Sequence, residues 1–254
     1  MESGVAKEPI EDWQKYEDAL LQRLGNDCKI VTLLLNRAKT NPKRVVFAEA
    51  DHLDVLKAAQ IVHEEGIAIP ILLGRQDVIE KLKAEIEFEA DVIIIDPKSD
   101  QQIEQKNKYA KVYWEQRKRR GVTYFSSQKL MRERNYYAAM MVNEGDADAL
   151  ITGYSRSYPS VVKPMLELIG LAPGSTRVAT TNVMMTKRGP MFLSDTSINI
   201  NPSAEDLIKI SQMTAGVVKM FGMEPVMAMI SYSNFGSSKN QTATKVREAV
   251  AYLH

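Results

Sequence analysis

Short apolar runs alternate with amphipathic segments over most of the 254-residue chain. In the first two thirds, runs rich in Val, Ile and Leu predict buried strands at 44–48, 69–73, 92–95 and 147–152. Between and around them, apolar residues spaced three or four positions apart predict helices at 30–38, 55–62, 77–87, 102–119, 133–142 and 160–169. Strands that alternate with helices in this way favour a mostly parallel sheet covered by helices on both faces, which is an α/β fold.

A second α/β block is expected after the segment 170–174, where two glycines and a proline interrupt the periodic pattern. Its strands are predicted at 178–184, 191–193 and 226–230, and its helices at 204–221 and 242–253. Ser203 followed by Asp206 predicts a capping box at the start of the first of these helices. We therefore divide the chain into a linker and leading helix (1–30), a first α/β lobe (31–172) and a second α/β lobe (173–254).

The second lobe is expected to lack its C-terminal part. Three predicted strands are few for an open α/β sheet, which commonly has five or six. The last predicted helix has an apolar face formed by Val246, Ala249, Val250 and Leu253, and no segment follows that could cover it.

Composition limits the classes of partner. Lys and Arg number 33 and Asp and Glu 32, so the net charge is +1 and no field of the whole molecule attracts nucleic acid or an anionic membrane. An anionic ligand must therefore be held by a local site. The single cysteine, Cys28, and the three scattered histidines predict neither a disulfide nor a zinc site, and the absence of a long apolar run favours a cytoplasmic protein.

Several common nucleotide and hydrolase motifs are missing. The chain has no Gly-x-Gly-x-x-Gly fingerprint, no Walker-type Gly-Lys-Ser/Thr loop, no Gly-x-Ser-x-Gly elbow and no His-Glu-x-x-His. We therefore do not expect this chain to bind NAD(P) or to hydrolyse ATP through those motifs.

Polar loops follow several of the predicted strands. The Ser/Asn/Gly loop 231–238 is either a ligand loop or an ordinary polar turn whose hydroxyls cap the next helix. The basic run 117–123 is either a solvated helix end or the source of one arginine for a cleft. The loops 153–156 and 195–202 also follow strands. Because carboxyl ends of parallel strands share one edge of a sheet, we expect these loops to converge on one crevice.

Five segments together resemble the phosphate acetyltransferase family. They are 44–49 with 55–59, 117–123, 140–148, 195–199 and 231–236. The resemblance is sharper to the phosphate acetyltransferase-like C-terminal domain of the large bacterial NADP-dependent malic enzymes, since Asn234-Phe235 stands where the true acetyltransferases have Thr-Lys. The opening segment 2–10, with Trp13 and Tyr16, is similar to the linker that joins the malic catalytic domain to this one.

The resemblance implies two lobes of the isocitrate and isopropylmalate dehydrogenase type, with a cleft between them that binds acetyl-CoA or a related acyl-CoA or acyl phosphate. It also implies a homodimer or higher homo-oligomer that forms through the second lobe. The candidate ligand-binding residues of the cleft are Arg117, Tyr154, Ser155, Lys163, Asp195, Asn199, Ser231, Ser233, Asn234 and Gly236. No residue is assigned a catalytic or metal-binding role.

Three positions depart from the family pattern. Tyr154-Ser155-Arg156 replaces the family's His-Ser/Thr-Thr, Lys163-Pro164 replaces Arg-Pro, and Leu53-Asp54 replaces Glu-Arg. A lysine cannot clamp a phosphate bidentately as an arginine does. The catalytic Ser-Arg and aspartate of the acetyltransferases belong to a C-terminal segment that this chain lacks, so acetyl transfer is expected to be negligible.

Three hypotheses about function follow. The first is a regulatory domain that senses acetyl-CoA within an NADP-dependent malic enzyme, whose reaction is the oxidative decarboxylation of malate to pyruvate. NADP and a divalent metal would then bind to the malic domain and not to this chain. The second is a phosphate acetyltransferase, and the third is an oligomerisation domain with a vestigial cleft. No nucleic acid or membrane is expected as a partner.

Overall fold

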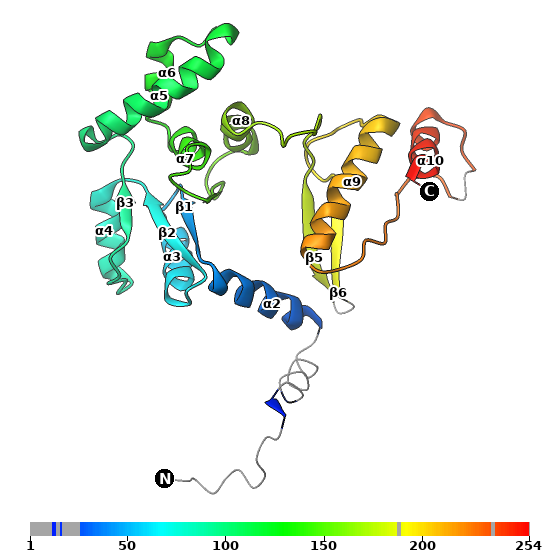
Figure 1. Cartoon of the computed structure of the whole chain (residues 1–254), viewed down its shortest axis with the longest axis horizontal. Coiled ribbons are helices and arrows are strands. Elements are labelled where there is room, and N and C mark those ends of the chain that lie inside the picture. The colour runs from blue at the N-terminus through cyan, green and yellow to red at the C-terminus, as the bar shows by residue number, and fades with distance from the viewer. Residues whose placement is uncertain (1–11, 14–15, 17–25, 187–188, 235–236, 254) are drawn as a thin grey trace, which may run out of the picture. The chain divides into compact units, whose positions relative to one another are not determined.

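The computed structural model describes residues 12–13, 16, 26–186, 189–234 and 237–253 (Figure 1). The chain divides into two compact units, one formed by residues 35–170 and the other by residues 1–34 together with 171–254. Each unit is described by itself. The leading helix predicted from Trp13, Tyr16 and the leucines up to residue 24 lies almost entirely outside the described residues. The first full helix is α2 (Asn26–Thr40).

The unit formed by residues 35–170 is built on a parallel sheet of four strands, in the order β3-β2-β1-β4. The strands are β1 (Lys43–Phe47), β2 (Ala68–Leu73), β3 (Ile93–Ile95) and β4 (Ala149–Ile151). Val46 is paired with Ile71 on one side and with Leu150 on the other, which makes β1 a central strand. The predicted strands and their parallel arrangement are confirmed, with ends that differ by at most two residues.

Helices cover both faces of this sheet, as alternation along the strands requires. Phe47 and Leu72 point to the face covered by α3 (Leu53–Glu64) and α4 (Gln76–Glu85). Val46 and Ile71 point to the other face, where α5 (Ile103–Arg117), α7 (Arg134–Asn143) and α8 (Tyr158–Leu168) supply the core. Because side chains alternate at every residue of a strand, two apolar faces need runs without polar interruption. The runs in β1 and β2 meet that need.

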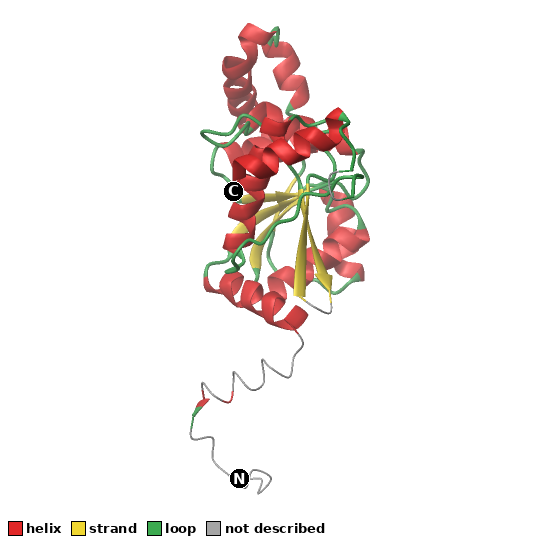
Figure 2. Cartoon of the chain, turned by 90° about the vertical axis from the view of Figure 1, so that its right-hand side faces the viewer, coloured by secondary structure: helices red, strands yellow, loops and turns green. Residues whose placement is uncertain are grey.

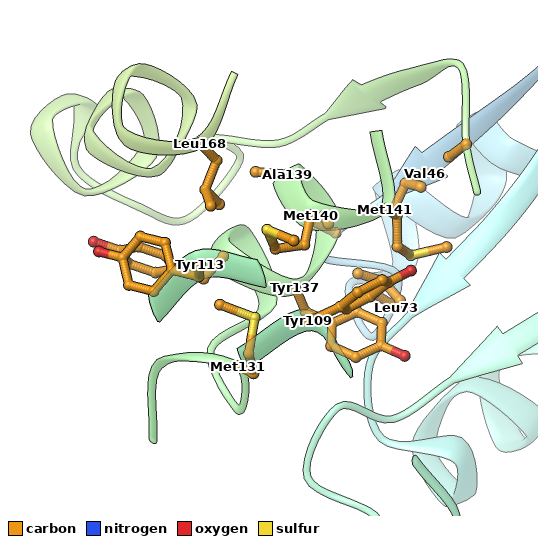
Figure 3. Packing of buried hydrophobic residues seen from close by; sticks show 14 of the residues in the cluster. Val46, Leu73, Tyr109, Tyr113, Met131, Tyr137, Ala139, Met140, Met141 and Leu168 are labelled. Atoms are coloured by element: carbon orange, nitrogen blue, oxygen red, sulfur yellow. The ribbon is translucent and has the colours of Figure 1, made fainter. Parts of the chain in front are cut away.

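Tyrosines and methionines dominate the larger of the two cores. Tyr109, Tyr113, Tyr137, Met131 and Met140 are all at most 2% exposed. Figure 3 shows them packed between β1, β2 and the end of α8 at Leu168. The rings of Tyr109 and Tyr137 meet edge to face, with centroids 5.1 Å apart. Their hydroxyl groups reach polar partners at the rim, as buried tyrosines usually do.

The basic run divides differently from the prediction. Helix α5 ends at Arg117, and residues 118–120 form the single 3-10 turn η2 (Lys118–Arg120), closed by Gly121 at a φ of 86°. A positive φ is accessible to glycine without strain. A further helix, α6 (Tyr124–Leu130), was not predicted. Thr123 caps this helix through a capping box with Ser126. The sequence did not indicate the box, because Ser126 stands where a capping box usually has Glu or Gln.

The second unit contains a two-stranded antiparallel sheet, β5 (Thr181–Thr186) and β6 (Gly189–Ser194), which packs against α9 (Ala204–Met220). Helix α10 (Gln241–Leu253) packs on α9 (Figure 2). The capping box of Ser203 and Asp206 is confirmed. The prediction of a mostly parallel arrangement is wrong for this pair, because β5 and β6 run antiparallel, with Thr181 opposite Ser194 and Thr186 opposite Gly189.

The strand predicted at 226–230 is also wrong within the described residues. This segment forms no backbone hydrogen-bond ladder with β5 or β6. Its side chains at both ends are exposed, Val226 to 97% and Ile230 to 88%. An apolar run alone does not make a strand, because a strand also needs a neighbour with free backbone groups in register. No helix in the described part of the chain is long and apolar enough to cross a bilayer.

Candidate functional site

The strand order of the first unit creates a crevice at the carboxyl ends of β1 and β4. The chain leaves β1 toward α3 on one face of the sheet and leaves β4 toward α8 on the other. The two loops that follow these neighbouring strands therefore diverge. Open α/β sheets bind ligands outside the carboxyl ends of strands at such a switch point.

Glu49 joins the two diverging loops. It lies two residues beyond β1 and is only 3% exposed. Its Oε2 accepts the backbone N–H groups of Gly153 and Tyr154, at 2.9 and 2.7 Å. Its Oε1 accepts the backbone N–H and the hydroxyl of Ser155, at 3.1 and 2.5 Å. Burial raises the pKa of Glu49, but these four donors outweigh it and the net shift is downward.

A pocket of about 270 Å³ opens beside this junction. Its walls come from the loop after β1, the end of α6, the start of α7, the loop after β4 and α8. The lining residues are Glu49, Leu130, Glu133, Arg134, Asn135, Tyr136, Arg156, Ser160, Lys163 and Pro164.

The cations of the pocket differ in how they are neutralised. Arg134 forms a bidentate pair with Asp51, with both N–O distances 2.6 Å, so its charge is compensated within the fold. The pKa of Asp51 is raised by burial but lowered overall by this pair. Among the described residues, Arg156 and Lys163 have no hydrogen bond or ion pair. The pocket therefore offers an anion two cationic side chains that no hydrogen bond or ion pair holds, although Glu167 lies near enough to interact with the charge of Lys163.

Helix α8, which carries Lys163 and Ser160, is anchored one turn further along by Glu167. The hydroxyls of Tyr136 and Tyr113 donate to Glu167 Oε2 at 2.7 and 3.0 Å, and the guanidinium of Arg117 pairs with Oε1 at 3.3 Å. Burial raises the pKa of Glu167, yet these donors and the nearby charge of Lys163 lower it overall. The same carboxylate raises the pKa of Tyr113, together with burial, to about 12.

The structure brings three of the sequence-predicted site residues near this pocket. Lys163 lines it, and Ser155 is bound to Glu49 at its edge. Tyr154 is 57% exposed and donates its hydroxyl to Asp54 on α3, so its side chain braces the loop and does not line the pocket. Arg117 is half-buried against Glu167 and is not among the lining residues.

Two further predicted residues, in the other unit, hold a loop together. Asp195 accepts the N–H and hydroxyl of Thr180 at 3.0 and 2.6 Å, and the N–H and amide of Asn199 at 2.6 and 2.7 Å. Asn199 also donates to the carbonyl of Val178. Burial raises the pKa of Asp195, but these donors depress it strongly overall. In the described contacts, both side chains are engaged in positioning the segment after β6.

The loop at 231–238 makes mainly internal bonds. The hydroxyl of Ser231 accepts the N–H of Ser233, and the hydroxyl of Ser233 accepts the N–H of Ser238. The backbone carbonyl of Asn234 accepts the N–H of Ser237. Gly236 lies outside the described residues. These contacts agree with the polar-turn alternative, while the expected convergence of this loop with the first unit stays a prediction.

Sequence reasoning missed Glu49, Asp51, Arg134 and Arg156 as site residues. The first two had a usable signal, since they are acidic residues directly after a buried parallel strand. Arg134 had none, because only the fold brings α7 next to the loop after β1. Arg156 was noted only as a departure from a family pattern. Within the described residues no group of three or more His, Cys, Asp or Glu side chains is arranged to hold a metal ion.

Comparison with known proteins places this geometry in context. The profile of the phosphate acetyl/butaryl transferase family matches residues 29–254. NADP-dependent malic enzymes of Haemophilus influenzae and Escherichia coli are 35% and 36% identical over 98% of this chain. The chain spans only about a third (33%) of the length of those relatives.

Stand-alone enzymes match as well. A phosphate acetyltransferase of Thermoanaerobacterium thermosaccharolyticum is 33% identical over 87% of this chain and 68% of its own length. The solved structure of the EutD phosphotransacetylase from Staphylococcus aureus superposes with a TM-score of 0.77 at 28% identity, over 89% of this chain and 68% of that one. A phosphotransacetylase from Streptococcus pyogenes matches with the same TM-score at 30% identity.

Proposed function

Because the chain belongs to the phosphate acetyl/butaryl transferase family, we propose that it is a domain that binds acetyl-CoA, or a related acyl-CoA or acyl phosphate, and regulates an NADP-dependent malic enzyme. The observation that carries the proposal is the pocket at the carboxyl ends of β1 and β4, in which Arg156 and Lys163 form no ion pair among the described residues. Each acyl compound named has phosphate groups that such cations bind. The similarity to malic enzymes over 98% of the chain supports the choice of parent enzyme.

Binding without transfer is the simpler function for this set of residues. Of the two arginines in the pocket, Arg134 is paired with Asp51, so only Arg156 is left to clamp a phosphate bidentately, and α8 adds a lysine instead of another arginine. In the described part of the pocket, the hydroxyl of Ser160 donates to the carbonyl of Ser157, and no base is bonded to it. Activation of a thiol or hydroxyl requires such a base.

Regulation needs a ligand that prefers one of two domain arrangements. Typical coupling free energies are about 1–3 kcal/mol, which one or two charge-assisted hydrogen bonds can supply. We also propose that the loops at 195–202 and 231–238 of the second unit contribute to ligand binding, and that a homo-oligomer forms through that unit. The malic domain of the same protein is the partner that receives the signal.

A phosphate acetyltransferase is the second candidate. The 33% identity to the Thermoanaerobacterium enzyme and the fold match to two phosphotransacetylases favour it. The two functions make opposite predictions for turnover. An acetyltransferase converts acetyl-CoA and phosphate to CoA and acetyl phosphate, and the CoA thiol released can be followed with a thiol reagent.

Calorimetric titration with acetyl-CoA, followed by the thiol-release assay on the same preparation, tests both. We expect saturable binding of acetyl-CoA without release of thiol above the buffer control. Binding with steady turnover would establish the second candidate. Absence of binding to the chain and to a malic enzyme that contains it would reject the regulatory proposal. The matched control is Lys163→Ala, which we expect to weaken binding about ten- to hundredfold, the usual effect of losing a charged hydrogen bond.

A further inference from the structure

Four of the hydrogen bonds that hold the loop carrying Arg156 go to one side chain, that of Glu49. Residues 153, 154 and 155 each donate a backbone N–H to Glu49, and Ser155 adds its hydroxyl. The donors come from three consecutive residues, and Arg156 follows directly. Gly153 has a φ of 106°, a backbone conformation that glycine adopts more readily than other residues.

Glu49 faces these donors without a cation. Its two carboxylate oxygens accept four hydrogen bonds from neutral groups, and none of its bonds or ion pairs in the described structure is to Arg156, Arg134 or Lys163. A buried carboxylate normally pairs with a cation or binds a metal, because an isolated charge is poorly solvated by protein. Here the loop itself solvates the charge, so the conformation of residues 153–155 depends on that charge.

We propose that Glu49 is a positioning residue, which fixes the loop after β4 so that Arg156 is directed at a phosphate group of the ligand in the pocket. The proposal rests on the proposed function, since it takes the bound anion to be a phosphate of an acyl-CoA, an acyl phosphate or inorganic phosphate. In this proposal the carboxylate of Glu49 favours binding of the anion, whereas charge repulsion alone would make a carboxylate in the pocket weaken it.

A charge test separates positioning from repulsion. Glu133 also lines the pocket, is exposed, and has no side-chain hydrogen bond or ion pair among the described residues. Glu49→Gln and Glu133→Gln each remove one negative charge from the same pocket. If the carboxylates act only through charge, both variants bind phosphate more tightly. If Glu49 positions the loop, its variant binds more weakly while Glu133→Gln binds more tightly.

Replacing Glu49 by glutamine disrupts its hydrogen bonds although the two side chains have nearly the same shape. One of its two terminal atoms becomes an NH₂ group, and either choice places a donor against two donors of the loop. Only the Ser155 hydroxyl could reverse its role and accept. At least one backbone N–H therefore loses its partner, and the loop must move.

The experiment measures the affinity of the wild type, Glu49→Gln, Glu133→Gln, Arg156→Ala and the Glu49→Gln/Arg156→Ala double variant for inorganic phosphate and for acetyl-CoA, by calorimetry. We expect Glu49→Gln to weaken binding on the order of tenfold, as a misplaced contact does. Glu133→Gln should tighten it about two- to fivefold. In the Arg156→Ala background the Glu49 change should have less than about a twofold effect, because residues that act through one another are not additive.

A structural readout accompanies the affinities. Amide hydrogen exchange of residues 153–155 should accelerate in Glu49→Gln but not in Glu133→Gln, and midpoints of thermal unfolding should show that both variants are folded at the assay temperature.

The outcomes discriminate clearly. A wild type that binds neither probe rejects the proposed function and, with it, the target of Arg156. A wild type that binds, with additive effects of Glu49→Gln and Arg156→Ala or with tighter binding by Glu49→Gln, overturns the positioning role and leaves the proposed function standing.

Discussion

Glu167 is the point at which α8 is bonded to α5 and α7, and its replacement by alanine should destabilise the first unit strongly. The change leaves the hydroxyls of Tyr113 and Tyr136 without their acceptor and Arg117 without its counter-charge. Each hydrogen bond to a charged group contributes about 1.5–3 kcal/mol. The guanidinium is only 18% exposed, so its unpaired charge adds to the loss. Some relaxation toward solvent will offset part of this, and we expect a total loss of about 3–5 kcal/mol.

Tryptophan fluorescence can measure the loss of stability in the first unit, because the chain has only two tryptophans. Trp114 lies in α5, beside Tyr113, and Trp13 can be replaced by phenylalanine so that Trp114 alone reports. Urea unfolding followed by its fluorescence should show the full loss for Glu167→Ala. At roughly 2–4 °C per kcal/mol, the thermal midpoint should fall by about 6–20 °C.

Matched variants control for the loss of a charge as such. Glu115→Ala on α5 removes an exposed pair with Lys118 and should change the stability by less than about 0.5 kcal/mol. Tyr113→Phe removes a single hydroxyl and should destabilise by about 1.5 kcal/mol, the low end of the range for a hydrogen bond to a charged group. A loss below about 1 kcal/mol for Glu167→Ala would refute the account of this junction, because it would mean that solvent replaces all three partners.

Two other predictions follow from the hydrogen bonds of single carboxylates and caps. The hydrogen bonds and charge of Arg44 lower the pKa of Asp148 to about 2. The stabilisation that they provide is therefore complete above pH ~4 and is lost as the pH falls toward 2. Asp148→Asn should flatten this part of the stability profile, measured by urea unfolding. A stability that is unchanged between pH 5 and 2.5 in the wild type would contradict it. Ser203→Ala removes the capping box of α9 and should lower the free energy of unfolding by about 1 kcal/mol. The control is Ser211→Ala, which replaces a mid-helix serine bonded to the carbonyl of Leu207 and should have little effect. Equal urea midpoints for the wild type and Ser203→Ala would argue against the cap.

The sheet of the first unit could be predicted because burial on both faces leaves a direct mark in the sequence. Ile71 and Leu73 pack in one core and Leu72 packs in the other, so the run is apolar throughout, and amphipathic helices flank it. Residues 226–230 have the same composition without the same structure. Composition reports that a segment is apolar, but the formation of a strand depends on a partner elsewhere in the chain, and that is a tertiary property.

The same distinction explains the outcome for the pocket. Ser155 and Lys163 were identified because they lie in a strand-end loop and in a segment that resembles a family pattern. Arg117 was identified on the same grounds, yet in the structure it pairs with Glu167. A basic residue at a helix end has the same sequence signature whether it binds an anion or an internal carboxylate. Only the positions of Asp51 and Glu167 decide which cations are already neutralised.

Those internal carboxylates also explain how a chain with a net charge of only +1 can present a cationic pocket. Asp51 is bonded to Arg134, Glu167 to two tyrosines and Arg117, and Glu49 to four neutral donors of one loop. Glu49 differs from the other two carboxylates, because neutral groups stabilise its negative charge and no cation is paired with it. A carboxylate solvated by backbone N–H groups leaves every nearby cation available to a ligand. The local field of the pocket is therefore set less by the number of its charges than by the partners that its acidic residues bind.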